Sequence, residues 1–409
     1  MAPSATSIAK LLPADRESAL CILQRRSGVL GEHIERLRAM PAHGNRKLKI
    51  DQLLTGLLLA FFDPTIRSLR MIEDKGSFDG RLDLSRMARS TTADALAVFD
   101  PACLQPIIDD LRSRVPHLGH ADKDLVGITR QIVAADGTYL NTLADIAWAL
   151  HQTRRNGSGH GQVRANFQVD VETWIPQAVT ISGDDGESEA AAFAHDLLSG
   201  VLYVIDRNFL DFLFLIELLA KGNDFVLRAR SNAPAVRVLE TRALTAADAE
   251  AGVVADELVE LSGRGAPAGT FRRVTIHTTN RKGELEIIIL LTNLTDESIA
   301  AHVIGAVYHR RWQIELFFKW LKTWARMDHL LSTSRNGITF QFYVAVIGVL
   351  MMYVQTGRRV SIYAMAAMGR LSRGECTPEE MMAVIARRDR EREMDRARQA
   401  RRRARKKLV

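Results

Sequence analysis

The segment from Tyr308 to Lys322 (YHRRWQIELFFKWLK) constrains this 409-residue chain more than any other. Read as one helix, it places Tyr308, Arg311, Glu315 and Lys322 within an arc of about 60°. The other positions are mostly apolar, and there are too many apolar residues for one narrow buried face of a helix. One interpretation is a solvated helix face with ordinary i,i+4 pairs. The other is a cleft in which a carboxylate flanked by cations binds both a metal ion and phosphate.

Two further acids close short apolar runs. Gln131–Asp136 reads QIVAAD and Val201–Asp206 reads VLYVID. Runs of this kind that end in Asp and a turn are typical of central strands with a carboxylate at the end. Each Asp alone could equally cap a turn or the next helix. Together with Glu315, however, they make three carboxylates, and three can hold two hard divalent cations.

These residues carry a resemblance to a known family. The spacing Tyr308-x2-Arg311-x3-Glu315-x6-Lys322 matches the signature of DDE transposases of the insertion-sequence-four type. The phrases DGTYL from Asp136 and DRNFL from Asp206 look like the first two acids of that family's triad. The phrase IIILLTNLTDES before the final helix is also similar. The resemblance extends roughly from residue 125 to residue 330.

The resemblance implies a fold and a reaction. The fold is α/β: a ribonuclease-H-like mixed sheet with flanking helices, a strand-rich insertion before the last acid, and an N-terminal helical domain. The reaction is cut-and-paste transposition, with metal-dependent cleavage of DNA ends through a hairpin, followed by strand transfer. The catalytic and metal-binding residues would be Asp136, Asp206 and Glu315, holding two Mg²⁺ or Mn²⁺ ions. The DNA contacts would be Tyr308, Arg311, Lys322, Arg207 and Lys319.

The same resemblance implies partners. These are double-stranded DNA, as terminal inverted repeats and as target, and a second copy of the chain in a synaptic dimer. The sequence departs from the family between Asn280 and Val307, where some relatives carry a tryptophan that stabilises a flipped base at the hairpin. Trp312, Trp320 and Trp324 come later, and we expect them in the core.

Five regions follow from the distribution of elements. Helices are expected over residues 1–125, with possible DNA-end binding, and the first part of the catalytic core over 126–231. A strand-rich insertion is expected over 232–294. The helix with the last acid falls within 295–335, and C-terminal helices with a basic tail within 336–409.

Charge is concentrated in that tail. The net charge is +7, and residues 387–409 hold 12 Lys/Arg and 4 Asp/Glu, so the remainder of the chain is close to neutral. A basic tail indicates contact with nucleic acid or another polyanion, or else a solvated helix end. Cys21, Cys103 and Cys376 show no metal or disulfide spacing. The apolar run Phe342–Val354 is shorter than a bilayer span, so we expect a cytoplasmic, nucleoid-associated protein without a membrane segment.

Three other functions fit part of the sequence. A structure-specific nuclease or resolvase would use the same chemistry without strand transfer. A domesticated DNA-binding protein would keep the fold but lack catalysis. A general basic RNA- or DNA-binding protein would bind through its tail alone.

Overall fold

The computed structural model describes most of the chain from residue 30 onward. The described ranges are 30–41, 48–63, 65–78, 84, 87–115, 123–141, 148–149, 151–152, 161–183, 187–231, 234–280, 282–323, 325, 327, 329–357, 362–372 and 375–407. The chain forms two compact units, one of residues 116–319 and one of residues 1–115 with 320–409. Cys21 and Trp324 lie outside the described residues.

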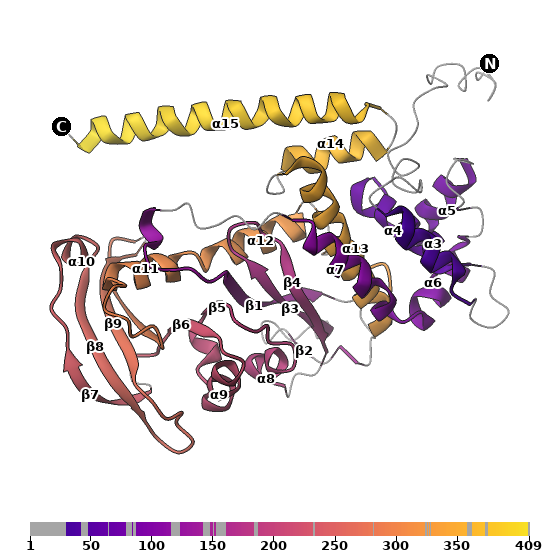
Figure 1. Ribbon diagram of the computed structural model, residues 1–409. Coiled ribbons are helices and arrows are strands. Elements are labelled where there is room, and N and C mark those ends of the chain that lie inside the picture. The colour runs from indigo at the N-terminus through magenta and orange to yellow at the C-terminus, as the bar shows by residue number, and fades with distance from the viewer. Residues whose placement is uncertain are drawn as a thin grey trace. The chain divides into compact units, whose positions relative to one another are not determined.

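The unit of residues 116–319 is built on one mixed sheet (Figure 1). β1 (Ile132–Asn141) pairs antiparallel with β3 (Gly161–Asp170), and β3 pairs antiparallel with β4 (Pro176–Ser182) and the short β2 (His151–Gln152). On its other side β1 runs parallel to β5 (Leu202–Ile205), which runs parallel to β6 (Asp224–Arg228). The order β4-β3-β1-β5-β6 is the ribonuclease-H-like arrangement, so the expected α/β fold is confirmed.

We expected the first acid, Asp136, at the end of a strand, but it lies within β1. β1 pairs with β3 over its whole length, from Val133 opposite Asp170 to Asn141 opposite Gln162. Its parallel pairing with β5 stops at Ala135 opposite Ile205. β1 therefore continues past β5 because β3 still supports it, and Asp136 lies where support from β5 ends.

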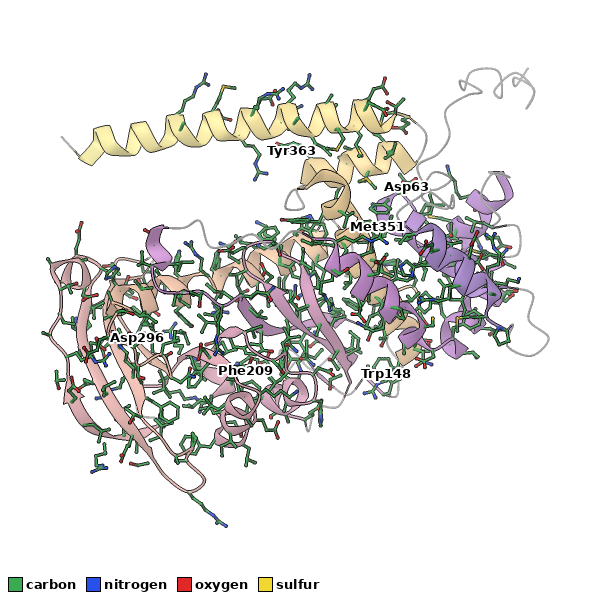
Figure 2. All side chains as sticks on the ribbon, in the orientation of Figure 1. Asp63, Trp148, Phe209, Asp296, Met351 and Tyr363 are labelled. Carbon is green, nitrogen blue, oxygen red and sulfur yellow. The ribbon has the colours of Figure 1, made fainter. Side chains whose placement is uncertain are left out.

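Helices cover both faces of this sheet. α8 (Glu189–Ala194) and α9 (Phe212–Ala220) lie on one face, while α11 (Ala301–His309) contacts β5 and β6 (Figure 1). Val133 and Ala135 of β1 and Tyr203 and Ile205 of β5 share a buried core with residues of α8 and α9. Figure 2 shows Phe209 in this core, where its ring lies 5.2 Å from that of Phe193 and 5.6 Å from that of Phe214. On β3, Phe167 packs edge-on against Phe317, with ring centroids 5.5 Å apart.

The strand-rich segment before the last acid extends the same sheet. β7 (Ala235–Thr241), β8 (Val253–Ser262), β9 (Phe271–Thr279) and β10 (Leu285–Thr292) follow one another as antiparallel neighbours, and β10 pairs with β6. A short helix, α10 (Ala246–Glu250), connects β7 and β8. The segment expected to be rich in strands, 232–294, therefore joins the core sheet edge to edge.

One buried ion pair fastens this extension to the chain that leads into α11. The guanidinium of Arg272 donates to both carboxylate oxygens of Asp256, at 2.8 and 2.7 Å. Its third nitrogen donates to the backbone carbonyl of Ile299 at 2.7 Å. Both charged side chains are almost fully buried, so neither has water as an alternative partner.

The other unit is helical in its described residues. Its central helix is α13 (Arg335–Thr356), and Gly348 lets Phe61 of α4 pack against it, since a Cβ there would lie 2.4 Å from the Phe61 ring. Met351 of α13 is fully buried, and Figure 2 marks it. The remaining helices are α3 (Gly31–Ala39), α4 (Ile50–Phe62), α5 (Leu69–Phe78), α6 (Arg89–Val98), α7 (Gln105–Ser113), α14 (Ile362–Ser372) and α15 (Pro378–Lys407).

α13 is longer than its apolar run predicted. Ser334 caps it by accepting from the Gly337 N–H, so the helix starts ahead of Phe342. Its residues 335–354 are long and apolar enough to cross a membrane by length and composition alone, yet 83% of the most apolar window is buried inside the protein. This burial is that of a core helix. α15 begins at Pro378, where Thr377 and Glu380 form a reciprocal capping box.

Candidate active site

Asp136 and Asp206 meet at a notch in the sheet. Ala135 and Ile205 are paired residues of neighbouring parallel strands, and each acid comes directly after its partner in that pair. The backbones of Ala135 and Ile205 are therefore separated by about 4.8 Å, the spacing of adjacent strands. β5 ends at Ile205 whereas β1 continues, so the two carboxylates flank an open place beside β1. The order of acids and strands expected from the sequence brings these two together.

The segment that carries the last acid is two helices rather than the single helix expected. α11 ends at His309 and α12 (Trp312–Thr323) begins at Trp312. At the junction the Arg311 N–H donates to the Tyr308 carbonyl and the Ile314 N–H to the Arg311 carbonyl, three residues back in each case. These bonds tighten the chain into a turn. Arg311 therefore lies at the junction, and Glu315 in the first turn of α12.

Arg311 links the last acid to the first. Its Nη1 lies 3.5 Å from Asp136 Oδ2 and 3.4 Å from Glu315 Oε1. The two carboxylate oxygens are thus at most the two distances combined, about 6.9 Å, apart. Burial would lower the pKa of Arg311, but Tyr308 and the acids Asp136, Asp206 and Glu315 raise it overall. One guanidinium is the shared counter-ion of all three predicted acids.

A fourth carboxylate, which we did not predict, reaches the notch. The Gly137 N–H lies beyond the end of β5, and it donates to Glu189 Oε1 at 2.6 Å and to Asp136 Oδ1 at 2.9 Å. Burial first, and then repulsion from Glu189, raises the pKa of Asp136 to about 7. The pKa of Glu189 is also raised, chiefly by burial and with a contribution from Asp206. Burial and mutual repulsion therefore disfavour the ionised forms of both acids in this notch.

The donors suit a hard divalent ion, but the side chains are not arranged around one. Among the residues described by the structure, no three His, Cys, Asp or Glu side chains lie close enough together to hold a metal ion. Arg311 lies between Asp136 and Glu315, and Asp136 and Asp206 each accept a hydrogen bond from the next residue's N–H. Carboxylate oxygens are the ligands that Mg²⁺ and Mn²⁺ prefer, so the residue types fit.

The other predicted contacts differ in exposure. Tyr308 is largely buried, and burial raises its pKa while it interacts with Arg311. Arg207, which follows Asp206, and Lys319 on α12 are exposed. Lys322 lies in the last turn of α12, two turns beyond Glu315. Because α12 crosses the boundary between the two compact units, Lys322 belongs to the other unit.

One tryptophan is not where we expected it. Trp320 is buried as predicted, with 4% of its surface exposed, whereas Trp312 is 45% exposed. Trp312 lines a cavity of about 580 Å³ between α11 and strands β8 to β10, together with Tyr308, Arg310 and Arg311. The opposite wall is apolar and includes Ile276 and Ile288. Trp312 is the first residue of α12 and comes directly after the turn at Arg311.

Comparison with protein families adds an independent finding. A family model described as a transposase DDE domain matches residues 127–352, more than half of the chain. This range contains all four carboxylates and the Tyr308–Lys322 segment.

Individual relatives carry similar descriptions. A protein of Sinorhizobium fredii named as a transposase is 28% identical over 204 residues, which cover 49% of this chain and 55% of that protein. A Synechocystis protein named as the transposase of an insertion sequence element is 25% identical over 236 residues, 54% of this chain and 59% of that protein. The chain thus spans somewhat more than half the length of these relatives.

A solved structure was also compared. The synaptic complex of piggyBac transposase with hairpin DNA is 12% identical in sequence and superposes with a TM-score of 0.40, covering 90% of this chain and 79% of that one.

Proposed function

Because this chain belongs to the family of proteins with a transposase DDE domain, we propose that it is a DNA transposase that cuts an insertion sequence at its ends and joins it to new DNA. The observation that supports this most directly is the meeting of Asp136, Asp206 and the Arg311–Glu315 pair at one notch in the sheet. A nuclease or resolvase and a DNA-binding protein without catalysis would have the same fold but act differently on DNA, and the experiment below distinguishes them.

Transposases with this domain use divalent metal ions. In our proposal two Mg²⁺ or Mn²⁺ ions are held by Asp136, Asp206 and Glu315, with Asp136 and Asp206 on the sheet and Glu315 on α12. When bound, such ions activate the attacking oxygen and neutralise charge on the phosphate and the leaving oxygen. Ligands on a strand, directly after a strand and on a helix are held more firmly than ligands on a long loop.

In this proposal Arg311 has two alternative partners, the carboxylates of the site and a DNA phosphate. In the structure its guanidinium balances Asp136 and Glu315. A guanidinium also binds phosphate oxygens in a bidentate manner, which an ammonium cannot do. Turning Arg311 from the carboxylates to a DNA phosphate would place a cation on the substrate and leave both acids free to bind metal.

The remaining contacts position the DNA. Arg207 and Lys319 are exposed cations suited to backbone phosphates, and Lys322 extends the same helix beyond Glu315. Such contacts fix the register of the duplex without reading its sequence. Tyr308 supports Arg311 from the end of α11. The N-terminal helices, residues 1–125, are proposed to help bind the element's ends.

The reaction consists of successive in-line displacements at phosphorus. Water attacks the phosphodiester at the element's end and releases a 3′-hydroxyl. That hydroxyl attacks the opposite strand to form a hairpin, water reopens the hairpin, and the 3′-hydroxyl finally attacks target DNA. Each step forms one P–O bond and breaks another, so one set of carboxylates can serve all of them. In our proposal Trp312, which is exposed beside the cavity, stacks on an unpaired base at the hairpin.

The proposal includes two kinds of partner. One is double-stranded DNA, as inverted-repeat ends and as target. The other is a second copy of the chain, since joining two ends of one element requires that both be held together.

The test uses full-length protein and labelled duplexes that carry the DNA flanking its own gene, with Mg²⁺ and a supercoiled target plasmid. We expect end cleavage and joined products. Asp136→Asn, Asp206→Asn and Glu315→Gln should each lower cleavage at least about a hundredfold while end binding persists. Glu217→Gln, an exposed acid on α9, is the control.

Each contrary outcome identifies another function. Cleavage without joining would indicate a nuclease or resolvase. If the wild-type protein binds the ends but does not cleave them, and Asp136→Asn behaves as wild type, the chain is a domesticated DNA-binding protein.

A further inference from the structure

Glu189 lies in the notch although no motif of the sequence marks it. It is the first residue of α8, after Ser188, whose side chain accepts from the Ala191 N–H. α8 lies on the face of the sheet away from α11, so Glu189 approaches β1 from the side opposite Glu315. The two glutamates therefore reach the same segment of β1 from the two faces of the sheet.

Glu189 and the first acid, Asp136, share one backbone N–H donor, which limits the distance between their carboxylates. Glu189 Oε1 and Asp136 Oδ1 accept from the same Gly137 nitrogen, at 2.6 and 2.9 Å. Their oxygens are therefore no more than about 5.5 Å apart, the two distances combined. Two oxygens bound to one metal ion lie at most about 5.2 Å apart, twice the longest metal–oxygen bond of about 2.6 Å, so the limit found here is close to that of a shared ion.

The absence of a side chain at residue 137 permits this approach. A Cβ built at Gly137 would lie 2.6 Å from Glu189 Oε1, too close for any real contact. A glycine inside a strand often marks a place where another group comes close to the backbone. Here that group is a carboxylate next to the first catalytic acid.

A buried arginine fixes the chain that leads into Glu189. Arg164 of β3 is 4% exposed and donates to the backbone carbonyls of Glu187, at 3.2 Å, and Ser188, at 3.3 Å. Its Nε also donates to Asn166 Oδ1 at 2.9 Å. Because its donors bind backbone carbonyls, Arg164 positions the start of α8 whatever side chain stands at residue 189.

The notch holds more carboxylates than guanidinium groups, and Arg164 is the cation near Glu189. Four carboxylates approach the notch, and Arg311 is already shared among three of them. If Glu189 served only to accept from the Gly137 N–H, a neutral amide would do so without adding charge to a buried place. A further carboxylate is balanced when divalent cations bind beside it.

We propose that Glu189 is a fourth carboxylate of the metal centre, providing an oxygen ligand next to Asp136 on the face of the sheet opposite Glu315. This proposal rests on the proposed function, since that function supplies the metal. Glu189 would hold the ion nearest Asp136, directly or through a bound water.

The test is Mn²⁺ binding to the purified full-length protein without DNA, measured by electron paramagnetic resonance and by calorimetry. Glu189→Gln keeps the shape and the acceptor for the Gly137 N–H but removes the charge. We expect its Mn²⁺ affinity to fall about tenfold or more. Glu187→Gln is the matched control: its carboxylate bonds to Ser182 and lies 3.8 Å from Arg164, and its affinity should remain that of wild type.

A third variant separates failure of this inference from failure of the proposed function. If Asp136→Asn loses Mn²⁺ binding while Glu189→Gln binds as wild type, Glu189 is structural only and the inference is wrong. If Asp136→Asn also binds as wild type, the proposed metal centre itself is wrong.

Folding is checked by thermal unfolding in EDTA. Should Glu189→Gln unfold, Glu189→Asp replaces it, because this variant keeps the charge but shortens the reach. We expect Glu189→Asp to bind Mn²⁺ more weakly than wild type, and wild-type affinity in this variant would contradict the inference.

Discussion

Nη1 of Arg311 lies 3.5 Å from Oδ2 of Asp136, a residue 175 positions earlier in the chain. This contact brings the Tyr308–Lys322 segment to the sheet, and it places a protein cation between two of the proposed metal ligands. Arg311 and a divalent ion are therefore expected to compete for the same carboxylates, which is the basis of the first prediction.

Arg311→Met should raise the affinity of the DNA-free protein for Mn²⁺ and at the same time weaken binding to DNA ends. The methionine keeps much of the volume of the arginine stem but removes the charge that balances Asp136 and Glu315. Calorimetry gives the metal affinity, and electrophoretic mobility shift gives the DNA affinity. Arg310→Met removes an equal charge one residue earlier and should leave the metal affinity close to that of wild type. A parallel loss of both affinities in Arg311→Met would contradict this prediction.

Metal affinity should depend on pH through Asp136. Its pKa is raised to about 7, so below that pH the carboxyl carries a proton that a metal ion must displace. Mn²⁺ affinity should therefore fall by up to about tenfold for each pH unit below 7 and level off above it. Asp136→Asn should bind weakly at every pH and lose this step. An affinity that is flat between pH 5.5 and 8 in the wild type would show that Asp136 is ionised throughout.

The same group should make the metal-free protein less stable as pH rises. The folded-state pKa of Asp136 is raised above its ordinary value of 3.8, so the folded protein holds a proton that the unfolded chain releases. The stabilising contribution is therefore complete below about pH 4 and is lost as the pH rises through 7. In EDTA, the wild-type Tm should fall between pH 5 and 8 more steeply than that of Asp136→Asn, as measured by scanning calorimetry.

Gly137→Ala should impair metal binding without changing any ligand. The new methyl would lie 2.6 Å from Glu189 Oε1 and 3.1 Å from Arg164 Cδ, so the carboxylate must move away. Glu189→Asp, which shortens the side chain by one methylene, should partly relieve the clash. We therefore expect the double variant to bind Mn²⁺ better than the two single losses combined would predict. Strictly additive losses would mean that the methyl acts elsewhere.

The sequence predicted the parts of this site that follow from local pattern. The runs before Asp136 and Asp206 identify strands by β-branched residues, and the order of elements then makes them neighbours. The turn at Arg311 was missed because the apolar periodicity continues on both sides of it, and the backbone bonds that tighten it leave no mark on composition. Glu189 was missed because α8 reads EAAAFA, an ordinary helical segment. The available signal was the glycine after Asp136, which indicates close approach within a strand but not which residue approaches.

The ion pair of Arg272 and Asp256 was equally hidden, since each residue looks like part of an alternating, half-exposed strand. Asp256→Ala should destabilise the protein by about 3–5 kcal/mol, because it leaves a buried guanidinium without its carboxylate. Arg273→Ala is the control: it removes the neighbouring, partly exposed pair with Glu257 and should cost at most about 1 kcal/mol. Urea unfolding followed by circular dichroism measures both. A loss of similar size in the two variants would mean that burial is not the cause.

The basic tail should contribute affinity for DNA but not the choice of site. Residues 387–409 hold 12 Lys/Arg in a chain whose remainder is nearly neutral, and α15 includes this segment as far as Lys407. A protein ending at residue 386 should bind DNA more weakly, and the slope of log affinity against log salt should fall by about 0.9 for each phosphate that the tail neutralises. It should still distinguish its own ends from unrelated DNA. Deletion also removes Arg388, whose guanidinium lies 5.6 Å from the Tyr363 ring, so a second protein with glutamines at Arg401, Arg402, Arg403 and Arg405 tests charge alone. Complete loss of binding in both proteins would make the tail the principal DNA-binding element, and an unchanged salt slope in both would mean that the tail does not contact DNA.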